Sequence, residues 1–331
     1  MQVLLHAKEN ENALKEYAVD LRLCGYLWLN ARGMGNDFSK ETAQQRTYRA
    51  FEALVMGNDA AIDVLQAALL IASTAYPDLD MEQCKAHLDD LAQRIRERLS
   101  LPDCCAQSQS SFDLDPATIL GAINQVLFEE EHFHSNRDDY YNPDNSFFNR
   151  VLETHSGIPI TLSLLYIEVG KRVGIALEGI ALPYQFVVRY CSPEGNIIYI
   201  DPYENGLLLN MEECKQRILR MSRGRLKIRE HWFKPVSNHL FLVRMLNNLK
   251  HIYLDTEDYE QLLIISDFIL LLIPHYAYEW RDRGVIHLQL KRYSHARRDL
   301  LRYLELEPNA DDYHEIRTYL RTIDQMIARL N

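Results

Sequence analysis

The sequence predicts an α+β fold that is mostly helical, with a small core of one buried helix and a short antiparallel sheet, followed by a helical-repeat tail. Residues 160–173 are apolar on most sides of a helix, which is typical of a buried helix. Short runs rich in β-branched residues follow within 177–201 and favour strands. Pro274 and Pro308 lie 34 residues apart, and such a period indicates a helical repeat.

Changes in composition divide the chain into three expected parts. These are an N-terminal helical region over 1–110, the core over 111–234 and the repeats over 235–331. Within the first part and the start of the core, hydrophobic periodicity predicts a helix at 12–30, one or two helices within 40–75, and helices at 80–99 and 116–130. The polar stretch 100–115 has little periodicity and reads as a linker.

The core helix has clear start and stop signals. Ser156-Gly157-Ile158 precedes Pro159, and proline suits the first helical position because its missing N–H group would be unpaired there anyway. Gly174 follows the last periodic residue, as is common at the end of a helix. The runs LEGIALP, QFVVRYC and NIIYIDP come next, and a Ser-Pro-Glu-Gly turn between the last two predicts a hairpin.

A helix, then a strand, then a strand ending in Asp201-Pro202 resembles the core of transglutaminase-like, papain-related proteins. In that family a Cys opens the helix, a His lies on the next strand, and an Asp ends the strand after that. The family's Cys lies two residues after a Gly and 15 before the Gly that ends the helix. In this chain that position is Pro159. The His position falls on Gln185 and the Asp position on Asp201.

The resemblance therefore implies a vestigial triad at Pro159, Gln185 and Asp201, and no catalytic residue is expected. A thiol at a helix N-terminus is favoured because the helix dipole stabilises the thiolate. Pro159 has no nucleophilic atom, and Gln185 cannot act as a base near neutral pH, so only the acid is left. Thr161 and Ser163 carry hydroxyls on the same helix but do not lie at the matching position.

A longer motif narrows the resemblance. It comprises NPDNSFF at 142–148, VL at 151–152, GIPI at 157–160, YIEV at 166–169, LEG at 177–179 and IDP at 200–202. This pattern is similar to a bacterial family, often named after the invasion-gene regulator B locus, that joins a transglutaminase-like core to C-terminal tetratricopeptide repeats. The similarity runs from about Ala68 to the C-terminus. This chain departs from the family pattern in two places. It has Gln185 where that family usually has His, and its residues 1 to about 50 have no counterpart in the family.

The tail follows the tetratricopeptide pattern in its second unit. Counted from Ala277, the residues that fall on the large aromatic, small, Ala and Pro positions of that repeat are Trp280, Gly284, Ala296 and Pro308. We expect Gly284 and Ala296 to face each other between two helices, with Trp280 buried. A last helix at about 311–330 would cap the stack.

The repeat family places the first helix of each unit on the concave, partner-binding face. The resulting candidates are Arg244, Asn247, His251, Tyr278 and Arg281. Arginine forms forked hydrogen bonds with carboxylates, so a carboxylate or an acidic peptide would suit this face. The alternative is that these side chains contact the core or pair with nearby acids such as Asp255 and Asp282.

Composition limits the class of protein. The net charge is −11, from 36 basic and 47 acidic residues, which argues against a general nucleic-acid or anionic-membrane surface. The first residues have no extended apolar run, so no signal peptide is expected. The most apolar segment, 262–273, is too short to span a bilayer and contains Asp267. We expect no nucleic-acid partner and no membrane association.

The cysteines and the acidic loop give no sign of a metal or a cofactor. Six cysteines show no CxxC or zinc-ligand spacing, which favours reduced thiols and a cytoplasmic location. The loop that begins near residue 129 contains several possible ligands, namely Glu129, Glu131, His132, His134 and Asp138. A cluster so close in sequence is typical of a solvated charge run, and we expect neither a metal nor a cofactor.

The expected function is therefore a non-catalytic interaction protein that binds a protein or peptide through its old catalytic groove, its repeat surface or both. The alternative is an active hydrolase or acyltransferase whose nucleophile, a Cys or Ser, comes from elsewhere in the chain. Small-molecule binding and a purely structural role also remain open.

Overall fold

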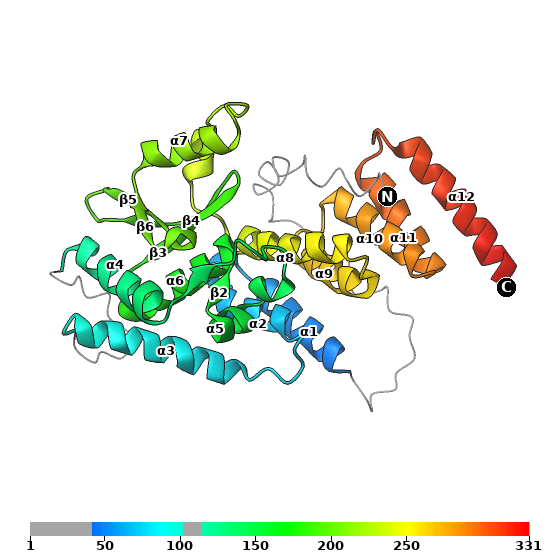
Figure 1. Ribbon diagram of the computed structural model, residues 1–331. Helices are drawn as coiled ribbons and strands as arrows, with labels where there is room; N and C mark the ends of the chain where they lie inside the picture. The colour runs from blue at the N-terminus through cyan, green and yellow to red at the C-terminus, as the bar shows by residue number, and fades with distance from the viewer. Residues whose placement is uncertain (1–41, 102–113, 331) are drawn as a thin grey trace. The chain divides into compact units, whose positions relative to one another are not determined.

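The core is built on a four-stranded antiparallel sheet that has helices on both of its faces (Figure 1). The structure is a computed structural model that describes residues 42–101 and 114–330. It has the α+β fold that the sequence predicts, with twelve α-helices in these residues. The expected helix at 12–30 and most of the expected linker lie outside the described residues.

The helices and strands have the following bounds. The helices before the sheet are α1 (Ala43–Val55), α2 (Val64–Ala72), α3 (Met81–Arg98), α4 (Pro116–Asn124), α5 (Phe148–Thr154) and α6 (Pro159–Val173). The strands of the sheet are β3 (Leu177–Leu182), β4 (Gln185–Cys191), β5 (Ile197–Asp201) and β6 (Leu207–Leu209). The helices after it are α7 (Met211–Met221), α8 (Asn238–Asp255), α9 (Tyr259–Leu272), α10 (Ala277–Gln289), α11 (Tyr293–Leu306) and α12 (Tyr313–Leu330).

The strands are joined in sequence order, β3-β4-β5-β6, and every neighbouring pair is antiparallel. The predicted strands at 177–201 are confirmed, while β6 was not predicted. It has only three residues, too few for an alternating pattern to be visible in the sequence. A turn through Asn205 and Gly206, both with positive φ, brings β6 back beside β5.

The two faces of the sheet are covered by different helices. α6 lies on one face, where a side chain at Gly170 would meet the Leu177 side chain at 2.4 Å. On the other face, Ile180, Val187 and Tyr199 form a buried cluster with residues of α7 and of the short helix η8 (Glu230–Phe233). Because alternate residues of a strand point to opposite faces, each strand residue can be assigned to the α6 side or the α7 side.

The predicted bounds of the core helix are confirmed. α6 begins at Pro159 and ends before Gly174, which has φ 104°, a left-handed conformation that favours glycine. Nearly all of its residues are buried, including Tyr166, because α3 covers the side that the sheet does not. The predicted helix at 116–130 is α4 followed by a π-helical turn, η5 (Gln125–Glu130).

The tail consists of two antiparallel helix pairs, α8–α9 and α10–α11, followed by α12. Trp280 is buried, as expected. A side chain at Gly284 would meet Leu300 at 2.8 Å, and Leu300 lies one turn beyond Ala296 on the same face of α11. The expected pairing of Gly284 with Ala296 itself stays a prediction. Leu300 also brings its backbone nitrogen within 3.3 Å of that point, so the missing side chain allows the two helices to approach closely.

α8 belongs to both the core and the repeats. Phe241 in its first turn packs edge-on against Phe186 of β4, while its later turns pack against α9. The described residues from Arg46 onward belong to one compact unit. Within the described ranges, none of the helices combines the length and the apolar character that crossing a bilayer requires.

Candidate functional site

The first position of the expected triad lies at the beginning of α6. Pro159 occupies the first helical position and is partly buried. The Thr161 hydroxyl accepts a hydrogen bond from the Ile158 N–H at 3.1 Å and so caps the helix start. The helix dipole at this end would favour an anion, but the proline side chain offers no atom that could carry the charge or attack a carbonyl.

The second position, Gln185, opens β4 opposite Leu182. Its side-chain nitrogen lies 3.1 Å from the sulfur of Met221 at the end of α7. Its side-chain oxygen is buried and has no hydrogen-bond partner among the described residues. An amide is neutral at every physiological pH, so this position supplies no base.

The third position, Asp201, ends β5 and is 4% exposed. One carboxylate oxygen accepts a hydrogen bond from the Arg217 guanidinium at 2.7 Å, and the other accepts the Tyr203 N–H at 3.1 Å. Burial raises the pKa of Asp201, and Arg217 opposes this rise. The acid is therefore held by a cation of α7, not by the residue at the expected base position.

The three triad positions do not lie on the same side of the sheet. Gln185 and Asp201 lie on neighbouring strands, as the sequence predicts. Val187 and Tyr199 face α7. Gln185 lies two residues before Val187, and Asp201 lies two residues after Tyr199. Because residues two apart on a strand point to the same face, the side chains of Gln185 and Asp201 also lie on the α7 side. Pro159 begins the helix that covers the opposite face.

The hydroxyls of α6 are engaged in structural hydrogen bonds. The Thr161 hydroxyl donates to the Asn145 carbonyl at 2.8 Å, and the Ser163 hydroxyl donates to the Phe186 carbonyl at 3.3 Å. Both residues are fully buried. The Ser163 bond ties the second turn of α6 directly to β4.

The described thiols differ in their surroundings. Burial raises the pKa of the Cys214 thiol to about 12 and also raises the pKa of Cys84. Both are therefore protonated near neutral pH and are poor nucleophiles. Cys191, at the end of β4, is exposed.

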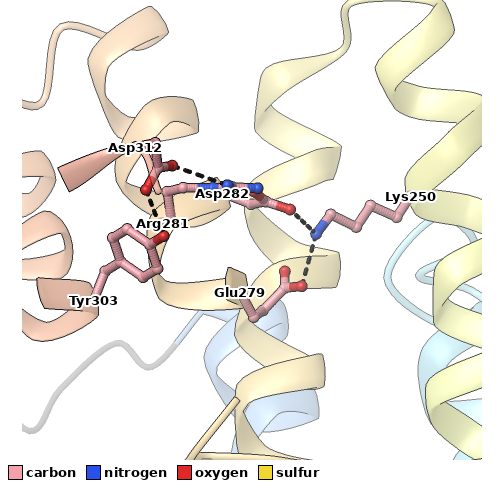
Figure 2. Close-up of polar contacts among 6 residues, drawn as sticks. All are labelled: Lys250, Glu279, Arg281, Asp282, Tyr303 and Asp312. Carbon is pink, nitrogen blue, oxygen red and sulfur yellow. Dashed lines mark hydrogen bonds and ion pairs between the residues drawn. The ribbon is translucent and has the colours of Figure 1, made fainter. Parts of the chain in front are cut away.

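The repeats contain a buried network of charged groups, shown in Figure 2. The Lys250 ammonium of α8 contacts Glu279 at 2.6 Å and Asp282 at 2.9 Å, both on α10. Arg281 pairs with Asp282 and also with Asp312, at 3.0 Å. Burial opposes the charge of Lys250, but Asp282 and Glu279 outweigh it and raise its pKa.

The network continues across the repeat helices. Tyr303 of α11 donates a hydrogen bond to Asp312 at 2.6 Å, so one chain of contacts joins α8, α10, α11 and the segment before α12. A second cluster lies nearby, in which Arg283 bonds Asp299 at 2.6 Å and Asp267 at 2.7 Å. These ion pairs fix the packing of successive helices rather than leaving the charges on the surface.

The predicted binding residue Arg281 is part of this buried network. It is 5% exposed and pairs with Asp282, which is one of the acids named in the sequence-based alternative. The sequence did not point to Lys250 or Glu279, although Lys250 lies four residues before Leu254 on a helix face that is otherwise apolar. A lone cation on such a face is a signal for a buried partner.

The other predicted binding residues are only partly buried. The Arg244 guanidinium lies over the Phe186 ring, 5.6 Å from its centre. The ring nitrogen Nδ1 of His251 donates to the Asn247 carbonyl at 2.6 Å. Tyr278 lies beneath the Arg281 guanidinium, with its ring centre 5.1 Å away.

The loop cluster after 130 does not converge as a group. The His134 ring bonds the His132 carbonyl at 3.0 Å, while the Glu131 carboxylate pairs with Arg94 of α3. Glu131 instead lies next to two histidines from distant parts of the sequence, His87 and His155. The sequence offered no signal for this grouping because 68 residues separate the two histidines.

Comparison with known proteins agrees with this architecture. The chain matches the family described as "Transglutaminase-like superfamily" over residues 82–247 and a tetratricopeptide repeat over residues 249–321. It is 32% identical to a UPF0162 protein of Xylella fastidiosa (strain 9a5c) over 273 residues, which cover 82% of this chain and 93% of that protein. No solved structure matches the chain.

Two further relatives are more distant. A UPF0162 protein of Vibrio cholerae is 27% identical over 249 residues, 75% of this chain and 88% of that protein. F-box only protein 21 of Homo sapiens is 29% identical over 193 residues, 53% of this chain and 31% of that protein. The narrower invasion-gene regulator B label is not confirmed by these relatives. The chain belongs to the transglutaminase-like superfamily, carries a C-terminal tetratricopeptide repeat, and has UPF0162 proteins of bacteria among its relatives.

Proposed function

We propose that this protein is a non-catalytic, protein- or peptide-binding scaffold built on a transglutaminase-like fold, that is, a pseudoenzyme. The observation that carries the proposal is the chemistry of the three triad positions. Pro159 has no nucleophilic atom, Gln185 has no basic one, and the Asp201 carboxylate is engaged by Arg217. An acid in such a triad only orients a histidine and cannot replace it.

The proposed binding surface lies where the core meets the repeats. Arg244 of α8 is the residue that links them, because it lies over the ring of Phe186 of β4 while sharing its helix with Asn247 and His251. Burial raises the pKa of Tyr140, and the positive charge of Arg244 opposes this rise. A ligand on Arg244 would thus contact the α6 side of the core and the repeat helix together, on the face of the sheet opposite to Gln185 and Asp201.

We propose an acidic peptide segment or a C-terminal carboxylate as the preferred partner chemistry. Arg244, Asn247, His251 and Tyr278 supply donors and an aromatic surface on a protein of net charge −11. Arg281 supports this surface from within, because its charge is already balanced by Asp282 and Asp312. The tetratricopeptide repeat is consistent with a protein partner.

The proposal places the protein in the cytoplasm. Cys84, Cys191 and Cys214 are free thiols, and reduced cysteines are typical of that compartment.

The test uses the full-length protein and a partner identified by crosslinking in the host lysate. The partner's affinity is measured for wild type, Arg244→Ala, Arg244→Lys and Tyr278→Ala at low and high salt. We expect Arg244→Ala to weaken binding by about tenfold or more and to reduce its salt dependence, because a charge-assisted hydrogen bond is lost. Arg244→Lys should recover only part of the affinity, since lysine lacks the planar fork.

Arg302→Ala is the matched control. Arg302 of α11 has a side chain that is 42% exposed and pairs with Glu305, and its removal should leave binding unchanged. Equal affinities for wild type and Arg244→Ala, with the same salt dependence, would move the partner away from this surface. Covalent transfer of an acyl group to or from the partner would support the hydrolase or acyltransferase alternative instead.

A further inference from the structure

We propose that His87, Glu131 and His155 form a binding site for a divalent transition-metal ion, with Zn²⁺ as the favoured ion. One ligand atom from each of the three side chains lies within 4.8 Å of the other two. Two imidazole nitrogens and a carboxylate oxygen are a donor set that suits zinc. Tetrahedral coordination needs donor separations of roughly 3.4 Å, which modest side-chain rotations can reach from this starting geometry.

The three ligands come from three separate elements that the fold brings together. His87 is in α3, Glu131 directly follows the π-helical turn η5, and His155 follows α5. The Glu131 N–H donates to the Val126 carbonyl, five residues back, which is the π-helical pattern. Such turns occur often at functional sites, because the extra residue changes where the following side chain points.

A hydrogen bond holds one ring nitrogen of His155. Its Nδ1–H donates to the Glu131 carbonyl, which leaves the lone pair of Nε2 for an ion. A backbone carbonyl bonded to the second ring nitrogen is the usual support of a metal-binding histidine. Phe133 stacks on the His155 ring with centres 4.4 Å apart, and the His155 carbonyl accepts the His134 N–H at 2.8 Å.

The surroundings allow an ion to enter and remain. All three residues are partly buried, so solvent can reach the site and supply a fourth ligand. Glu131 uses its Oε1 for Arg94, and Arg94 is also paired with Glu130, so its charge is shared between two carboxylates.

The ion would have a structural role. It would fasten α3 to the loop that carries β1 (His134–Ser135) and to the chain entering β2 (Ser156–Gly157). These two short strands pair with each other, and β2 leads directly into Pro159. Occupancy of the site would therefore stabilise the start of α6.

The test measures Zn²⁺ binding by calorimetry on the untagged full-length protein after chelator treatment, with Mg²⁺ present to occupy weak oxygen sites. Variants His87→Asn and His155→Ala are compared with His134→Ala, which removes an exposed histidine outside the cluster. We expect wild type and His134→Ala to bind Zn²⁺ alike, and each cluster variant to lose about tenfold or more in affinity. Zn²⁺ should raise the melting temperature of wild type and not that of His87→Asn.

Should His155→Ala lose its fold with its hydrogen bond and ring stacking, His87→Asn on the surface of α3 still decides the question. A wild-type protein that binds no Zn²⁺ would overturn the proposal. Equal Zn²⁺ affinity and equal thermal stabilisation in wild type and His87→Asn would overturn it as well, since the bound ion would then lie elsewhere in the chain.

Discussion

The carboxylate of Asp201 and the guanidinium of Arg217 form a buried ion pair at 2.7 Å, between the end of β5 and the middle of α7. Their side chains are 5% and 17% exposed. In a cysteine-type triad this carboxylate would orient a histidine. Here the arginine takes that place, so the ion pair joins a helix to the sheet rather than organising a catalytic base.

Replacing Arg217 with Met should lower the free energy of unfolding by about 3 kcal/mol. This value is at the lower end of the range for breaking a buried ion pair, because the Arg217 side chain is partly exposed. Without its partner, Asp201 has a still higher pKa in the folded state. As the pH rises through that pKa, the folded state must bury an unpaired charge and becomes less stable. The destabilisation caused by the substitution should therefore be smaller at pH 4 than at pH 7. Chemical denaturation of wild type and variant at both pH values measures this.

Arg220→Met is the matched control, because Arg220 is an exposed arginine one turn further along α7. It should change the free energy of unfolding by less than about 0.5 kcal/mol. Equal effects of the two substitutions would show that the Asp201–Arg217 pair contributes nothing.

Lys250→Met should cost about 3–5 kcal/mol, since it leaves Glu279 and Asp282 buried without their cation. Adding Glu279→Gln and Asp282→Asn should recover part of the loss. Lys215→Met, which breaks an exposed pair with Glu212, should cost less than about 1 kcal/mol. Urea denaturation compares them, and a Lys250 effect no larger than that of Lys215 would argue against a stabilising network.

His287 should make stability depend on pH between about 4 and 6.5. Burial lowers its pKa from 6.5 to about 4, although Asp299 at 3.6 Å opposes the change. The unfolded state therefore binds a proton first as the pH falls, and the stability that neutral His287 contributes is lost between 6.5 and 4. His287→Gln should flatten this part of the profile, by up to about 3 kcal/mol. Identical slopes for wild type and variant would contradict the assignment.

Gly284→Ala should destabilise the repeats by about 1–3 kcal/mol, because the added carbon meets Leu300 at 2.8 Å and the helices cannot separate freely. Ala296→Leu, at a fully buried position of α11, should have an effect of similar size. Gly121→Ala in α4 is the contrasting control, since nothing lies within 4 Å of its added carbon. It should stabilise by about 0.5–1 kcal/mol. Melting temperatures rank the three variants, and no loss in Gly284→Ala would exclude close packing there.

Local signals in the sequence were enough to predict the core helix and the neighbouring strands. Proline at the first position of α6 and Gly174 at its end act through their own backbone preferences, so neither depends on distant residues. The side-chain direction of Gln185 relative to Pro159 could not be predicted. It depends on strand register and on which helix covers which face, and both are set by long-range packing.

The burial of Arg281 also could not be predicted from local sequence signals. The repeat pattern correctly placed Arg281 on the first helix of a repeat unit, and its partner Asp282 is the next residue in the sequence. Asp312, which supplies its second carboxylate, lies 31 residues away, and Lys250 reaches the same acid from another helix. Only the packing of successive helices reveals that the charge is buried and balanced.

The most direct test of a non-catalytic role is an assay of amide hydrolysis and amine incorporation on glutaminyl substrates, with wild type and Asp201→Asn compared at equal concentration. Circular dichroism confirms that both proteins are folded. We predict that neither protein turns over substrate above a protein-free blank. Turnover by wild type that disappears in a folded Asp201→Asn protein would contradict this prediction and identify the site as catalytic.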